Sequence, residues 1–272
     1  MSYRSKTLIV TENEFAPSEK RLSICLRTNG FSFSELTDSG VLLTFGEAEG
    51  IHAGSMTGVM ADVKAFFTSV GIRPLGYRSM ELVVMSNESV WVPDELYSAA
   101  ANRQYLKLVG SEAITLMTAP CKALASTAVF AASDAMAMAF KVALPGLTVV
   151  NQHVKLASLG LERRSKEHPV LLTHWRDKVI DFAAYRDGRY IYGNTIAFKD
   201  DHEAVFHTIE VLKSFGLENA NAELLLCGEV DRERFAMLRP YFPVASLYTG
   251  SHTSILNPAF KALHTYKNAL IL

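Results

Sequence analysis

The pattern of apolar and polar residues predicts the same succession of strands and helices twice along the chain. In the first copy, alternating positions predict short strands, which are joined by turns whose Asn-Gly and Ser-Gly pairs accept positive φ. Helical spacing of apolar residues then predicts a helix over about Ser55–Val70, followed by a strand and a helix that Pro93 and Asp94 open. The predicted strands are Leu22–Leu26, Phe31–Leu36, Val41–Phe45 and Met80–Met85.

The second copy follows a charged connector, which runs from Gly160 to Pro169. It contains three strands, a helix over about Asp201–Phe215 that stops at Gly216, a further strand and a short helix from Asp231. The predicted strands are Val170–Thr173, Val179–Tyr185, Tyr190–Phe198 and Glu223–Cys227.

Additional elements are predicted between the copies: strands at Ile114–Leu124, Ala128–Ala132 and Thr148–Val150, and a helix at Asp134–Leu144. Antiparallel meanders followed by alternating helices and strands imply mixed sheets flanked by helices, an α/β fold. The repeated pattern suggests the duplicated architecture of actin, sugar kinases and heat-shock chaperones.

Composition narrows the function classes. The 272 residues include 27 basic and 28 acidic side chains, and the formal net charge of −1 argues against a broad electrostatic contact with nucleic acid or an anionic membrane. Cys25, Cys121 and Cys227 have apolar neighbours and no C-x-x-C spacing, which is typical of buried thiols in a reducing compartment. The longest apolar stretch, residues 128–144, contains Asp134 and Lys141 and is too short for a membrane span. We therefore expect a cytoplasmic protein.

Four stretches carry a family resemblance: RLSICLRTNGFSFSELTD, ELVVMSNESVWVPDELYSAAANRQYLKL, VFAASDAMAMAFKVALPGLTVVNQHVKLASLGL and YIYGNTIAFKDDHEAVFHTIEVLKSFGL. They resemble an uncharacterised bacterial protein family with an actin-like ATPase fold, over about residues 22–242. The resemblance implies two actin-like (ribonuclease H-like) lobes. We place the first at residues 1–165 and the second at residues 166–272, with a C-terminal helix that packs back on the chain.

Working members of this fold bind nucleotide between the lobes, where each lobe's first hairpin supplies an acidic residue and glycines for the metal and phosphates. The first hairpin here has Thr28, Asn29 and Gly30 but no carboxylate, which favours a plain turn. The second turn has Asp177 but no glycine, and Trp175 is bulky where phosphate should approach.

The adenosine end of such sites has paired glycines, of which only Gly228 is present. Without the missing carboxylate and glycines, Mg²⁺ would be held poorly and would neutralise the phosphate charge poorly. A ribonuclease H-like nuclease is disfavoured because the opening strands carry no acid, and Asp181 and Asp134 do not supply the set. Asn194 interrupts an apolar strand, so it needs hydrogen-bond partners if it is buried.

Our leading hypothesis is a non-catalytic scaffold or protein-interaction module that has a degenerate nucleotide site and no cofactor. The sequence names neither its protein partner nor its oligomeric state. The alternative is an ATPase or kinase that binds Mg-ATP through divergent cleft residues, namely Thr28, Asn29, Gly30, Asp177 and Gly228.

Overall fold

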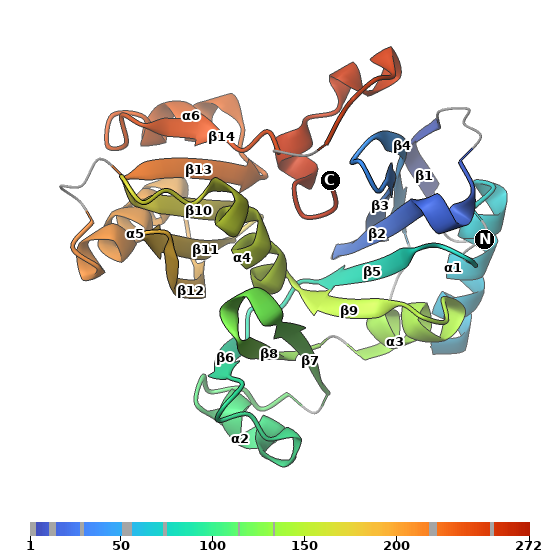
Figure 1. Cartoon of the computed structure of the whole chain (residues 1–272), viewed down its shortest axis with the longest axis horizontal. Coiled ribbons are helices and arrows are strands. Elements are labelled where there is room, and N and C mark those ends of the chain that lie inside the picture. Colours follow the sequence, from blue (N-terminus) through green and yellow to red (C-terminus); the bar gives the residue numbers. More distant parts are fainter. Residues whose placement is uncertain are drawn as a thin grey trace.

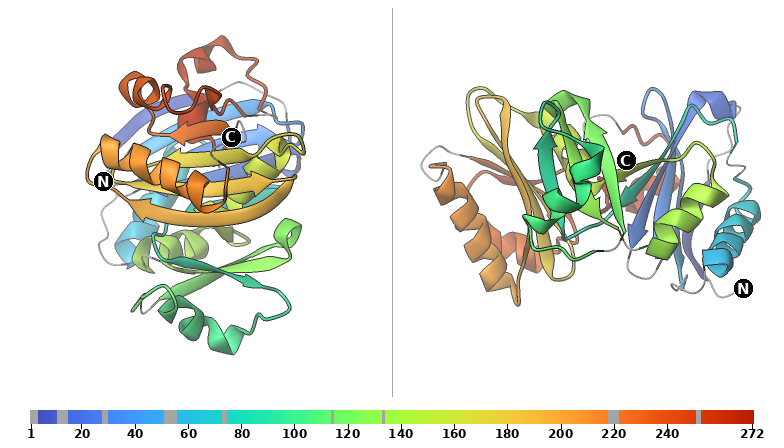
Figure 2. Two further views of the ribbon diagram at one scale, coloured as in Figure 1. Left: turned by 90° about the vertical axis from the view of Figure 1, so that its left-hand side faces the viewer. Right: turned by 90° about the horizontal axis from the view of Figure 1, so that it is seen from below.

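The computed structural model describes residues 4–10, 15–27, 30–50, 56–72, 75–113, 115–132, 134–217, 222–250 and 253–272. Two mixed sheets form two lobes that face each other across the middle of the molecule (Figure 1, Figure 2). On their outer sides lie the helices α1 (Met56–Ser69), α3 (Asp134–Ala143) and α5 (Asp201–Ser214). A smaller three-stranded sheet lies beside the two lobes.

The first lobe has a six-stranded sheet in the order β1-β4-β3-β2-β5-β9. Strands β1 to β4 form antiparallel pairs, and β5 and β9 continue parallel to β2. The bounds are β1 Arg4–Val10, β2 Lys20–Arg27, β3 Gly30–Thr37, β4 Leu42–Glu49, β5 Ser79–Val84 and β9 Thr148–Asn151, with helices α1 Met56–Ser69 and α3 Asp134–Ala143.

Aromatic packing fixes the helices of the first lobe on its sheet. The rings of Phe66 on α1 and Phe140 on α3 each meet Phe31 of β3 edge-on, with centroids 5.0 Å apart. Such pairs add about 0.5–1.5 kcal/mol each beyond the burial of their area. The helical spacing of apolar residues in α1 therefore reflects the face that meets β3.

The second lobe has a five-stranded sheet in the order β12-β11-β10-β13-β14. Its first strands form an antiparallel meander, and β13 pairs parallel to β10, as β5 does to β2 in the first lobe. Strand β9 pairs parallel to β5 as β14 does to β13, so five strands have the same order in both sheets. The bounds are β10 Val170–Trp175, β11 Val179–Arg186, β12 Arg189–Ala197, β13 Glu223–Gly228 and β14 Ala245–Leu247, with helices α5 Asp201–Ser214 and α6 Arg232–Leu238.

The small sheet, in the order β6-β8-β7, follows β5 along the chain and corrects one prediction. Pro93 ends strand β6 and does not open a helix; helix α2 begins at Asn102. The physical reason is that Val92 packs with Leu106 and Val129, which requires an extended chain paired with β8. The bounds are β6 Ser89–Pro93, β7 Leu116–Cys121, β8 Ser126–Ala131 and α2 Asn102–Lys107.

Helix α4 (Gln152–Arg163) connects the two large sheets. It begins after Asn151, whose side chain caps the helix by accepting a hydrogen bond from the backbone N–H of His153. It packs against β10, β11 and β12 of the second lobe. Gly160 permits this approach, because a Cβ there would lie 2.2 Å from the ring of Tyr185.

The C-terminal segment packs back over both lobes. It forms two short 3₁₀ helices, Pro258–Ala262 and Thr265–Asn268. Extended backbone at Leu263 and His264 interrupts the helical hydrogen bonding between them. Across the described ranges, no helix has the length and apolar character that a membrane crossing requires.

Candidate functional site

A cleft of about 690 Å³ lies between the lobes. Both lobes, the segment after β5 and the C-terminal segment contribute to its walls. The lining residues are Cys25–Arg27, Ser32, Val84–Glu88, Ala131, Ala132, Met136, His174–Val179, Gly228, Glu229, Lys267, Asn268, Leu270 and Ile271.

The cleft contains two of the residues proposed for a nucleotide site, Asp177 and Gly228. Thr28 and Asn29 lie outside the described residues. Gly30 does not line the cleft; a Cβ there would lie 1.9 Å from the carbonyl oxygen of Ala48, so glycine is required for the close pairing of β3 with β4.

Gly228 is also required for a structural reason. Its φ is +81°, and a Cβ would lie 2.2 Å from the carbonyl oxygen of Trp175 on β10. That carbonyl oxygen accepts a hydrogen bond of 2.7 Å from the backbone N–H of Glu229. The glycine therefore lets the chain leave β13 while it stays bonded to β10.

Trp175 belongs to the cleft wall, but its side chain is directed into the second lobe. Its ring is buried in the core of the second lobe, where it packs against Phe198, and its Nε1–H donates to Thr173 Oγ1 at 3.1 Å. Successive side chains of a strand point to opposite faces, so the neighbouring His174 takes the other face of the sheet, with Asp181.

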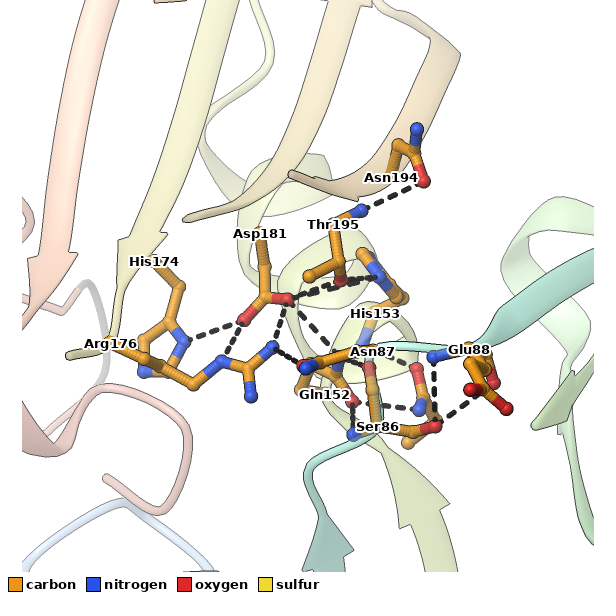
Figure 3. A network of polar contacts seen from close by, with 11 residues as sticks. Ser86, Asn87, Glu88, Gln152, His153, His174, Arg176, Asp181, Asn194 and Thr195 are labelled. Carbon is orange, nitrogen blue, oxygen red and sulfur yellow. Dashed lines mark hydrogen bonds and ion pairs between the residues drawn. The ribbon is translucent and has the colours of Figure 1, made fainter. Parts of the chain in front are cut away.

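The polar centre of this face is Asp181, which is fully buried. The strand register places Thr195, Asp181 and His174 directly opposite one another on β12, β11 and β10. The hydroxyl of Thr195 donates to Asp181 Oδ1 at 2.6 Å, and His174 Nδ1 lies 3.1 Å from Asp181 Oδ2 (Figure 3). Three strands thus present one row of connected side chains.

Arg176 binds the same carboxylate with two nitrogens. Its Nε donates to Asp181 Oδ2 at 2.9 Å and its Nη2 to Asp181 Oδ1 at 2.8 Å. The same Nη2 donates at 2.9 Å to Oδ1 of Asn87, in the segment that follows β5 (Figure 3). Arg176 therefore neutralises the buried charge and also joins two walls of the cleft.

The start of α4 completes the network. Gln152 donates from Nε2 to Asp181 Oδ1 at 3.2 Å, and its Oε1 accepts from the backbone N–H of Ser86 at 2.9 Å. His153 Nε2 lies 2.9 Å from Thr195 Oγ1. Because the Thr195 hydroxyl donates its proton to Asp181, its oxygen accepts from His153 Nε2–H, and His153 Nδ1 is left buried without a hydrogen-bond partner.

Burial and neighbouring charges shift the pKa values of Asp181 and His153. Burial raises the pKa of Asp181, but the hydrogen bond from His174 and the positive charge of Arg176 outweigh it and bring that pKa far below the usual range. Burial lowers the pKa of His153, since the charged ring would lose its hydration. The network therefore consists of an ionised carboxylate and a neutral His153 at neutral pH.

The arrangement leaves Asp181 no capacity for a metal ion. Five donor contacts converge on its two oxygens, which offer about four lone-pair sites. Within the ranges that the structure covers, no three His, Cys, Asp or Glu side chains are grouped so that they could hold a metal ion.

From the sequence, Asp181 is considered only as part of a nuclease site, which is disfavoured, and Asn194 is expected to need hydrogen-bond partners if it is buried. Asn194 is exposed, and its Oδ1 accepts from the backbone N–H of Thr195. The polar residue with buried partners is Thr195, because the alternation of the strand turns it toward Asp181. The available signal was an acid that interrupts the apolar run of strand β11, between Ile180 and Phe182.

A family model described as "Protein of unknown function (DUF3822)" matches residues 11–244. The chain belongs to this family. No curated protein matches this DUF3822 chain in sequence.

Solved structures similar to the DUF3822 chain include a Bacteroides thetaiotaomicron protein with an actin-like ATPase fold and unknown function. Its TM-score is 0.69 at 16% identity, over 85% of this chain and 91% of the other. A PilM–PilN type IV pilus biogenesis complex gives 0.58 at 10% identity, over 94% and 96%. The ethanolamine utilization protein EutJ from Carboxydothermus hydrogenoformans gives 0.50 at 9% identity, over 88% and 87%. The DUF3822 chain has the actin-like ATPase fold.

Proposed function

We propose that this DUF3822 protein is a non-catalytic actin-like scaffold or protein-interaction module whose nucleotide site has lost its metal-phosphate chemistry. The observation that carries the proposal is the occupation of Asp181 by Arg176. The guanidinium of Arg176 already pairs with the buried carboxylate of Asp181, beside the cleft.

Phosphoryl transfer needs Mg²⁺ to neutralise charge on the phosphates, and proteins hold that ion through carboxylates and water. Asp181 could bind a metal only by releasing Arg176 and its other donors, which would leave a buried cation unpaired. Asp177 is exposed at the turn between β10 and β11, and that turn contains no second acid. The first hairpin, between Arg27 and Gly30, carries no carboxylate.

The equal order of five strands in both sheets supports an origin by duplication of one lobe. A similar solved structure supports an interaction module. The similar PilM structure was solved in a complex with PilN, so the fold serves protein assembly there. The cysteines are free and buried, which supports a reducing compartment such as the cytoplasm.

The alternative function is binding and hydrolysis of Mg-ATP. It is favoured by the cleft of about 690 Å³ and by the presence of Asp177 and Gly228 in its wall. In that case Asp177 would hold the metal ion or its water ligand, and the protein would be an ATPase or a phosphotransferase.

Thermal unfolding with and without Mg-ATP separates the two functions. Ligand at 100 times its Kd adds about 2.7 kcal/mol to the free energy of unfolding, which raises Tm measurably. The scaffold proposal expects no rise in Tm and no phosphate release at millimolar Mg-ATP.

A rise in Tm that requires Mg²⁺ and is lost in Asp177→Asn would overturn the scaffold proposal. Asp187→Asn is the matched control, because Asp187 is an exposed acid at the next hairpin turn and does not line the cleft.

A further inference from the structure

The C-terminal residues 253–272, here named the strap, cross between the lobes twice. Before the strap, the backbone N–H of Tyr248 donates to the carbonyl of Leu226 in the second lobe at 2.8 Å. The strap then reaches the first lobe, where Ser254 N–H donates to Gly40 at 2.8 Å and Leu42 N–H donates to Ser254 at 3.0 Å. Ser254 also forms an isolated parallel bridge with Val41.

The second crossing returns through the middle of the molecule. The 3₁₀ helix Thr265–Asn268 packs against β13 of the second lobe. The last residues then lie on the first lobe, where the Ser34 hydroxyl donates to the carbonyl of Ile271, and Arg27 Nη2 donates to Asn268 Oδ1 at 3.0 Å. Figure 1 shows this C-terminal loop between the two large sheets.

The two ends of the strap are joined to each other. The hydroxyl of Thr253 donates to the backbone carbonyl of Leu272 at 2.5 Å, so the strap closes on itself while it contacts both lobes. Leu270 and Ile271 are 3% and 2% exposed and belong to the core of the first lobe. Lys267, Asn268, Leu270 and Ile271 also form part of the cleft wall.

The contacts of the strap differ in kind from those at the opposite end of the cleft. Across its described length, the strap has one isolated bridge and two short 3₁₀ helices, with no α-helix or ladder strand. Chain ends and loops open locally at a lower free energy than core strands and helices do. At the other end, the network of Asp181, Arg176 and Gln152 joins the lobes through buried charge-assisted hydrogen bonds.

We propose that the strap is a clasp that holds the two lobes together and closes the cleft, and that its release opens the cleft about the α4 junction. The apolar residues Leu270 and Ile271 are the closing contact, since both are buried in the core of the first lobe and also form part of the cleft wall. The clasp is independent of what the cleft binds, so its role stands apart from the proposed interaction function.

Cys25 supplies a probe inside the protein. It lines the cleft, is 6% exposed, and burial raises the pKa of its thiol to about 11 despite the opposing charge of Arg27, so the closed protein reacts slowly with thiol reagents. The test is the rate of labelling by 5,5′-dithiobis(2-nitrobenzoate) at pH 8, with peptide mass spectrometry assigning the labelled cysteine.

Ile271→Asp places a charge in the closing contact, and we expect Cys25 to label at least tenfold faster than in the wild type. Leu256→Asp is the matched control on the same strap, because Leu256 is 72% exposed, and it should label at the wild-type rate. Cys121, which is 4% exposed on β7 of the small sheet, should keep its wild-type rate in both variants.

Wild-type labelling of Cys25 in Ile271→Asp would overturn the clasp. Equally faster labelling of Cys25 and Cys121 would overturn it as well, because Cys121 lies in the small sheet and its exposure would show global unfolding. A milder variant, Ser34→Ala with Thr253→Val, removes the two hydroxyl donors that hold the strap's terminal carbonyls. It must also raise Cys25 labelling selectively, and an unchanged rate in this folded variant would contradict the proposal.

Discussion

The pairing of Arg176 with Asp181 gives the sharpest prediction about stability. Asp181 is fully buried, whereas the Arg176 side chain is 20% exposed. Arg176→Met keeps the apolar stem but leaves a buried carboxylate without its cation. Breaking a buried pair by removing one partner costs about 3–5 kcal/mol. With a urea slope of about 2–3 kcal/mol per molar, the unfolding midpoint should fall by about 1–2.5 M.

The reverse change should cost less. Asp181→Asn leaves Arg176 unpaired, but that side chain reaches water and can be hydrated, so we expect a loss of about 1–3 kcal/mol. The double variant should lose less than the sum of the single losses, because the second change removes the charge that the first left unpaired. Urea unfolding at pH 7 measures all three variants.

Arg189→Met controls for the loss of an exposed arginine, and its free energy of unfolding should change by no more than about 0.5 kcal/mol. The reasoning is refuted if Arg176→Met costs less than about 1 kcal/mol, or if Asp181→Asn costs more than Arg176→Met. Either result would mean that the carboxylate does not depend on its arginine.

Three further changes test other parts of the site. Gly228→Ala should lower the free energy of unfolding by more than Gly216→Ala. The new Cβ would lie 2.2 Å from a β10 carbonyl oxygen at position 228 and would meet nothing within 4 Å at position 216. Both variants carry the positive-φ cost of about 1–3 kcal/mol, so equal losses in urea unfolding would contradict the steric argument. Thr195→Val should cost about 1.5–3 kcal/mol because it removes a hydrogen bond to the buried carboxylate of Asp181. Asn194 is the exposed neighbour of Thr195, so Asn194→Ala should change stability little. Equal effects of the two variants in thermal unfolding would be inconsistent with the network. His153 has a lowered pKa in the folded state, so the unfolded chain binds the proton more readily; its contribution is complete above the unfolded value of about 6.5 and is lost as pH falls toward the folded value. His153→Gln should therefore flatten the decline in urea stability between pH 7.5 and 5, and an unchanged slope would argue against a buried neutral ring.

The local elements were determined by the sequence to a large extent. Alternation and turn residues located both meanders, as in Phe31–Leu36, which lies within β3 at Gly30–Thr37. Asp200 caps α5, and Asp231 caps α6, each through its own side chain, as acids at these positions predict. These signals are local: a strand's period, a glycine's φ and a cap depend on residues only a few positions apart.

The site was decided by tertiary structure. The Asp181 carboxylate receives donors from β10, β12 and α4, and Gln152 is 29 residues away in sequence. Composition and spacing could not show that Arg176 would bind this carboxylate, because the register of β10 and β11 sets His174 opposite Asp181, and Arg176 follows in the turn. The C-terminal segment is the same case: Ile271 meets Ser34 across 237 residues, and that contact exists only once both lobes have folded.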